Sequence, residues 1–103
     1  MDYKSDIAKY TQASINDKAV DAIVKFCGIA LQSRDASLVS CTDEAEVDRI
    51  RKGFATKILG LNEAESDKII KSVCEKMKAD KTKHRVTFYY LMAETSGKIG
   101  TLA

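Results

Sequence analysis

The sequence predicts an all-α fold, a single compact bundle of about four or five helices with the last long helix at its centre. Its 103 residues contain no proline and five glycines, a composition that favours long helices over short strands joined by turns. Apolar side chains recur at spacings of three and four in successive segments, and capping residues precede several of them. The length suits one hydrophobic core, so we expect one domain over residues 1–103.

The first third of the chain predicts two helices. Ile7 and Tyr10 are spaced as on one face of a short helix over residues 2–11. Asn16-Asp17 is a cap signal for a longer amphipathic helix. Phe26 carries apolar surface outside the main stripe, so we expect this helix to be well buried, and Gly28 marks either its early end or a close neighbour. Its main apolar face consists of Val20, Ile23, Val24, Cys27, Ala30 and Leu31.

The middle of the chain predicts an irregular stretch followed by a helix. Residues 32–42 are rich in small hydroxyl side chains, and Asp35 is expected to cap a single turn there that carries Leu38 and Val39 inward. Thr42 is expected to cap the next helix, and Gly60 to end it in the left-handed conformation. The apolar face of this helix is Val47, Ile50, Phe54 and Ile58, with Leu61 packing after the stop.

Two further helices follow. Asn62 and Glu65 have the spacing of a capping box, and the inner face of that helix is Ile69, Ile70, Val73, Cys74 and Met77. In residues 86–90 the sequence VTFYY favours a strand by local propensity, but a lone strand could not satisfy its backbone groups. We therefore predict a helix over about residues 82–95, capped by Asp80 or Thr82 and apolar nearly all round, as a central helix must be.

Cysteine use and the N-terminus bear on the compartment. The three cysteines, Cys27, Cys41 and Cys74, are odd in number and far apart. Their pattern argues against a disulfide framework or a zinc site and favours free, mostly buried thiols. The polar N-terminus is not followed by a long apolar run. We therefore expect a cytoplasmic protein with no membrane span.

Catalytic and cofactor motifs are absent from the sequence. It has no phosphate loop, dinucleotide fingerprint, calcium loop or zinc-protease motif, and its one histidine, His84, excludes a histidine-rich metal site. An enzyme would have to bring Arg34, Asp35, Cys41 and His84 into one pocket, with Cys41 as the nucleophile. The ordinary interpretation makes His84 a polar residue at a helix start and Cys41 a small packing residue. We expect a non-enzymatic protein without cofactor or metal.

Basic residues gather late in the chain, although the net charge is only +2. The basic corner, residues 76–85, could contact phosphates, with Tyr89 or Tyr90 stacking on bases. The alternative, which the sequence favours, is a solvated surface next to core aromatics. The candidate contacts for an anion or a partner are Arg34, Asp35, Lys78, Lys81, Lys83 and Arg85.

Arg85 is the candidate least like an ordinary surface residue. On a helical wheel it lies on the side of Phe88 and Tyr89, at a helix N-terminus where a cation opposes the dipole. A shielded arginine requires a carboxylate or a bound anion. We hypothesise a pair with an acid of the irregular stretch, Asp35 first among them. The alternative is a packed stem whose head group reaches water.

Three stretches, ALQSRDASLVSC, VCEKMKADKTKHRVTFYYLMAE and KILGL, together make nearly the whole chain similar to domain-of-unknown-function family 2853. The resemblance implies small, single-domain, all-helical, cytoplasmic bacterial proteins with no established activity, and it assigns no site residues. The sequence therefore leaves the function unknown. We expect a protein-interaction module that binds an unidentified protein partner or a second copy of itself, and the alternative is a weak phosphate or nucleic-acid binder that uses the basic corner.

Overall fold

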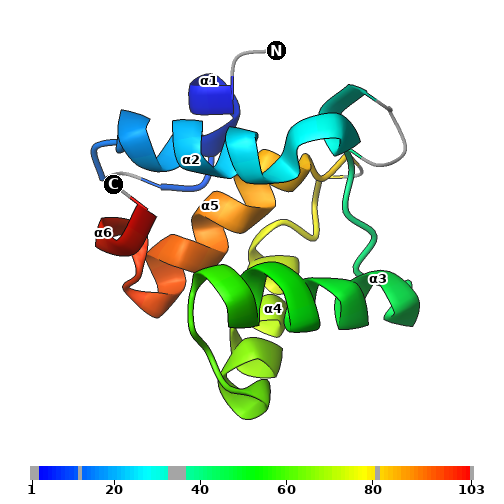
Figure 1. Cartoon of the computed structure of the whole chain (residues 1–103). Helices are drawn as coiled ribbons and strands as arrows, with labels where there is room; N and C mark the ends of the chain where they lie inside the picture. The colour runs from blue at the N-terminus through cyan, green and yellow to red at the C-terminus, as the bar shows by residue number, and fades with distance from the viewer. Residues whose placement is uncertain (1–2, 12, 33–36, 81, 103) are drawn as a thin grey trace.

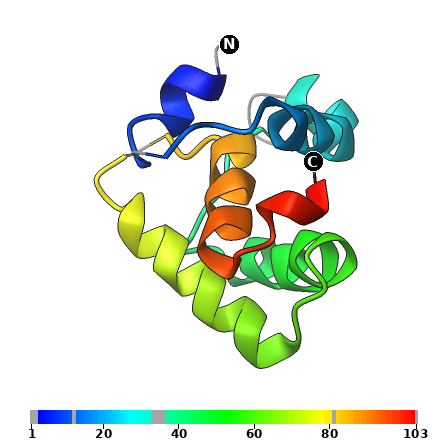
Figure 2. The same ribbon diagram turned by 90° about the vertical axis from the view of Figure 1, so that its left-hand side faces the viewer.

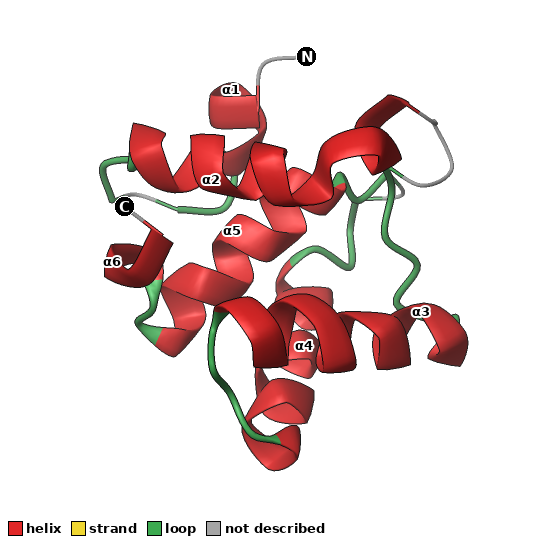
Figure 3. Ribbon diagram, in the orientation of Figure 1, coloured by secondary structure: helices red, strands yellow, loops and turns green. Residues whose placement is uncertain are grey.

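The computed structural model describes residues 3–11, 13–32, 37–80 and 82–102, which form helices and no β-strand (Figure 1; Figure 3). The predicted all-α fold is confirmed. In chain order the elements are α1 (Tyr3–Ile7), α2 (Asp17–Cys27), the 3₁₀ helix η1 (Gly28–Gln32), α3 (Glu44–Ile50), the π-helix η2 (Arg51–Ile58), α4 (Glu63–Lys76), α5 (Arg85–Ser96) and α6 (Ile99–Leu102).

Helix α5 is the centre of the fold, as predicted. Every residue from Arg85 to Ala93 is buried, and α5 contacts α1, α2, α4 and α6. It lies between α2 on one side and the α3–η2 rod on the other (Figure 1), with α4 alongside it (Figure 2). Because other helices surround α5, the apolar side chains of VTFYY are buried on every face of the helix.

Helix α5 begins three residues later than predicted. The Asp80 carboxylate accepts a hydrogen bond from the backbone of Thr82 (3.0 Å) within the preceding turn, so it does not cap α5. His84 occupies the cap position without a side-chain cap bond. At the other end Gly97 adopts the left-handed conformation, with φ at 74°, and ends the helix where Ser96-Gly97 predicts.

Helix α2 is positioned from both ends. Its cap residue Asn16 accepts a hydrogen bond from the backbone of Ala19 (3.1 Å) and donates its own backbone N–H to the Tyr90 hydroxyl of α5 (3.0 Å). Gly28, with φ at 48°, ends the helix early. Val20, Ile23 and Cys27 are buried as expected.

The helix predicted after Thr42 starts one residue later and changes its hydrogen-bond pattern. Asp43 is the cap, and its carboxylate accepts from the backbones of Ala45 and Glu46. From Arg51 onward the backbone is π-helical, which places an extra residue in each turn. As a result Phe54 and its neighbour Ala55 are both buried. Gly60 is left-handed at φ 68° and Leu61 is buried, as predicted.

Helix α4 confirms the capping box. The Asn62 side chain accepts from the backbone of Glu65 (2.8 Å), and the Glu65 carboxylate accepts from the backbone of Asn62 (3.1 Å). Ile70, Val73 and Met77 are buried, whereas Ile69 and Cys74 are only partly buried.

Candidate functional site

The irregular segment before α3 lies beside the start of α5. The backbone N–H of Val39 donates to the Lys83 carbonyl (2.8 Å), and that of Arg85 donates to the Ser37 carbonyl (2.8 Å). Leu38 and His84 form an isolated antiparallel bridge. Val39 is buried and Leu38 half-buried, so both side chains lie inward as predicted, but Leu38 is part of this bridge and not of a helical turn. Asp35, the predicted cap of that turn, lies outside the described residues.

Arg85 is held by several partners inside the protein. Its Nη2 forms an ion pair with the Glu46 carboxylate of α3 and donates to the Leu38 carbonyl (3.2 Å), and its Nη1 donates to the Tyr89 hydroxyl (2.9 Å). The Arg85 and Glu46 side chains are each 10% exposed. Asp35, the partner we hypothesised, lies outside the described residues, as does Arg34, so a contact with Asp35 stays a prediction. The alternative in which the head group reaches water is wrong, because the guanidinium is enclosed.

The burial of Glu46 could have been recognised from the sequence, but its place in the first turn of a helix offered a simpler explanation. As an acid in the first turn of a helix it is explained by the dipole alone. However, Glu46 precedes Ile50 by four residues and Phe54 by eight, so it lies on the buried face of the same rod. A carboxylate on an apolar face requires a buried partner, and here that partner is Arg85.

Electrostatics around this pair favour a charged arginine beside a neutral phenol. Burial lowers the pKa of Arg85, but Tyr89 and Glu46 raise that pKa above its ordinary value overall. Burial raises the pKa of the Tyr89 hydroxyl, and Arg85 lowers it in part. The phenol can therefore accept the hydrogen bond while the guanidinium keeps its charge. This arrangement stabilises the junction of α3 and α5.

An aromatic cluster extends from Tyr89 to the surface. The Tyr89 ring is stacked on Phe54, with centroids 4.2 Å apart and planes at 11°, and Phe26 packs edge-on against Phe54 at 5.5 Å. Phe26 is 42% exposed, so the expectation that its helix is well buried is wrong at this position. Tyr89 and Tyr90 are 5% and 2% exposed, so neither ring can stack on a base, and the favoured interpretation of these residues as core aromatics is confirmed.

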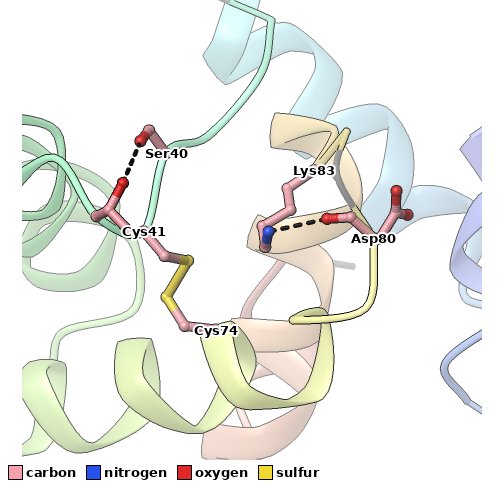
Figure 4. Close-up of a disulfide and its surroundings, with 6 residues drawn as sticks. Ser40, Cys41, Cys74, Asp80 and Lys83 are labelled. Atoms are coloured by element: carbon pink, nitrogen blue, oxygen red, sulfur yellow. Dashed lines mark hydrogen bonds between the residues drawn. A yellow bond between two sulfur atoms is a disulfide. The ribbon is translucent and has the colours of Figure 1, made fainter.

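The basic corner offers few unengaged cations. Lys78 Nζ pairs with Glu75 (2.6 Å), and Lys83 Nζ donates to the Asp80 carbonyl (2.8 Å; Figure 4). Arg85 faces the interior, and Lys81 lies outside the described residues. Within the described part of the corner, Lys78 and Lys83 thus have partners in the protein, whereas Lys76 is exposed.

Cys41 and Cys74 form a disulfide, so the expectation of three free thiols is wrong for two of them. Their Cα atoms are 6.0 Å apart although 33 positions separate them in sequence, because the fold brings the start of α3 beside α4 (Figure 4). With its sulfur bonded, Cys41 is not available as the nucleophile of the enzyme alternative. Cys27 is free and buried as expected, and burial raises its pKa to about 11.

The disulfide lines an open groove, the α3–α4 groove, of about 620 Å³ between the α3–η2 rod and α4. Its charged residues are partly paired with one another: Arg51 contacts Asp48 (2.9 Å) and, outside the groove lining, Asp67 (2.5 Å). The lining residues are Cys41, Glu44, Val47, Asp48, Arg51, Ile70, Lys71, Cys74 and Glu75. Five of these nine residues are charged, and an open groove of this size with a sulfur–sulfur bond in its wall can admit a small, polar thiol.

Two further features limit the chemistry of the described part of the chain. It contains no group of three or more histidine, cysteine or acidic side chains placed to hold a metal ion. Among the described helices none combines the length and apolar character that a membrane crossing requires.

Comparison with known proteins gives a family without an assigned activity. No curated protein matches the sequence. The sequence model of the family described as "Protein of unknown function (DUF2853)" matches residues 2–100, nearly the full length of the chain. The protein therefore belongs to the DUF2853 family.

Proposed function

We propose that this protein is a non-enzymatic interaction module of the bacterial cytoplasm that binds a second copy of itself through the surface around Phe26. The observation that carries the proposal is the exposure of this one ring. Among the side chains that the structure describes, Phe26 is the one large apolar group that is exposed to solvent.

The ring is suited to be the centre of an interface. It rests on Phe54 at 5.5 Å and lies 6.2 Å from Tyr89, and those two rings are stacked on each other. A supported ring loses little conformational freedom when it binds. Aromatic side chains of this kind dominate the energy of protein interfaces.

The choice of a second copy as the partner follows from charge and symmetry. Seventeen basic and fifteen acidic residues leave a net charge of +2, so two copies repel each other weakly. In a two-fold dimer the same patch serves both partners, so one exposed aromatic ring can suffice on each copy.

Two observations favour this proposal over the alternatives. Cys41 is bonded to Cys74, so the thiol that an enzyme would need is absent while the disulfide is intact. Lys78 and Lys83 have partners within the protein, and the tyrosines that would stack on bases are buried. Because these rings are buried, the exposed lysines of the corner would have to bind a phosphate or a nucleic acid by charge alone, and we do not propose this alternative.

Sedimentation equilibrium over a range of protein concentrations tests the proposal. We expect the wild type to show a monomer–dimer equilibrium, and Phe26→Ser to weaken it by a factor of about 30, the effect of losing an interface hot spot. Lys25→Ser, on the same helix, is the matched control and should leave the dimer constant nearly unchanged. Circular dichroism checks that each variant is folded. A wild type that stays monomeric at a protein concentration of about 1 mM would bind itself with less than about 4 kcal/mol, and this result would refute self-association.

A further inference from the structure

We propose that the Cys41–Cys74 disulfide is a reversible redox site, which a small dithiol reduces by entering the α3–α4 groove. Both cysteines line that groove, and both are partly buried and not enclosed in the core. A disulfide that a thiolate can reach is open to exchange, whereas one inside a core is not.

The surrounding contacts allow the bond to open without loss of the fold. Backbone hydrogen bonds from Val39 to Lys83 and from Arg85 to Ser37 hold the segment before Cys41. The Glu46 carboxylate, on the other side of Cys41, is paired with Arg85. The segment that carries Cys41 is thus attached on both sides by contacts that do not involve sulfur, so reduction should loosen the groove locally.

The charged residues that lie nearest in sequence differ between the two sulfurs. Glu75 is paired with Lys78, and Asp48 with Arg51 and Lys52. Lys71 lies one turn before Cys74 on α4, and Glu44 lies three residues after Cys41. A cation stabilises a neighbouring thiolate and an anion opposes it. Cys74 is therefore the better leaving group, and the reductant should attack Cys41.

The exchange then balances in two steps. A thiolate of the dithiol attacks Cys41 Sγ, a new sulfur–sulfur bond forms, and the Cys41–Cys74 bond breaks with its electron pair on Cys74. The second thiol of the reductant, once deprotonated, attacks the reductant's first sulfur, which is bonded to Cys41 Sγ in the mixed disulfide. This closes the reductant into a ring and releases the Cys41 thiolate. Two electrons pass to the protein, the reductant becomes a cyclic disulfide, and the two protons that it loses protonate Cys41 and Cys74.

The test uses the folded, oxidised full chain and dithiothreitol as the dithiol, with alkylation and mass spectrometry to count free thiols. We expect Cys41 and Cys74 to become alkylated without denaturant, Cys27 to stay protected, and oxidised dithiothreitol to restore the bond. The far-ultraviolet circular dichroism should not change on reduction. The proposal is overturned if reduction requires denaturant, if it unfolds the chain, or if no disulfide forms under the oxidant.

Two measurements test the assignment of the leaving group. Lys71→Gln should slow reduction by about twofold, the factor that corresponds to a neighbouring charge pair on a helix surface. Lys68→Gln, on the same helix but lining a different pocket, is the control and should leave the rate unchanged. With glutathione, a monothiol, the trapped adduct should be on Cys41. An adduct on Cys74, or equal rates for the two lysine variants, would show that the assignment is wrong. Phe26 does not line the groove, so these outcomes are independent of self-association.

Discussion

Replacing Glu46 by glutamine removes the carboxylate that faces Arg85 in the interior while it keeps nearly the same side-chain shape. Both side chains are 10% exposed, so water cannot replace the lost charge. Removing one partner of a buried ion pair costs about 3–5 kcal/mol, because the other charge stays buried without compensation.

The contacts of Arg85 place Glu46→Gln at the lower end of that range. The guanidinium keeps its hydrogen bonds to the Tyr89 hydroxyl and the Leu38 carbonyl, and the glutamine oxygen can still accept one bond. We therefore expect a loss of about 3 kcal/mol out of the roughly 5–15 kcal/mol that stabilise a domain. At about 4 °C per kcal/mol for a chain of this size, the melting temperature should fall by about 12 °C.

Urea denaturation of the oxidised protein, followed by circular dichroism, measures this loss. Arg49→Gln is the matched control, because Arg49 contacts the other oxygen of the same carboxylate at 3.4 Å but is 75% exposed. An exposed pair contributes at most about 1 kcal/mol. Arg85→Met should also be strongly destabilising, and the double variant with Glu46→Gln should lose less than the sum of the two single changes.

Equal stability of Glu46→Gln and Arg49→Gln would refute this reasoning, since it would mean that the Arg85–Glu46 pair is solvated. Additive losses in the double variant would refute it in a second way, since they would mean that Arg85 and Glu46 are not coupled.

Three further predictions concern single buried or half-buried groups. The hydrogen bond from Tyr10 lowers the pKa of Asp80, a contribution to stability that is present above the ordinary carboxyl pKa of 3.8 and lost as the pH falls. Tyr10→Phe should thus cost about 1 kcal/mol at pH 7 and less at pH 3 in denaturation curves, and a pH-independent loss would contradict it. Burial raises the pKa of Cys27 from 9.0 to about 11, so alkylation of Cys27 at pH 8 should be about 100-fold slower in the folded than in the unfolded chain. The stability that comes from keeping this thiol protonated should be lost as the pH rises from 9 towards 11. Among the described residues Ser66 Oγ is buried without a hydrogen-bond partner, so Ser66→Ala should leave the melting temperature unchanged or raise it, and a clear fall would argue against this.

Local features of the sequence were sufficient to predict most helices. The capping box of Asn62 and Glu65 and the left-handed stop at Gly60 involve residues at most a few positions apart, so they can be recognised without knowledge of the fold. The prediction was wrong where two local solutions compete. Asp43 caps α3 in place of the neighbouring Thr42. From Arg51 onward the backbone is a π-helix, although the spacing of the apolar residues there is equally compatible with an α-helix.

The candidate site was harder to predict, because its partners are distant in sequence. Arg85 was recognised as unusual from its place on an apolar face, but Glu46 is 39 positions away. The disulfide was missed because Cys41 and Cys74 are separated by 33 residues and no spacing rule connects such positions. The exposure of Phe26 depends on what packs against α2, which its own helix does not determine.

By itself, then, the sequence determined that this protein is all-helical, where most helices end and that α5 is central, because capping and periodicity act within a few residues. The tertiary structure alone decided that Glu46 faces Arg85, that Cys41 meets Cys74 and that Phe26 remains at the surface. The physical reason is that a buried charge, a thiol or an aromatic ring requires a partner but does not specify which one. Only the packing of α3 and α4 around α5 makes that choice.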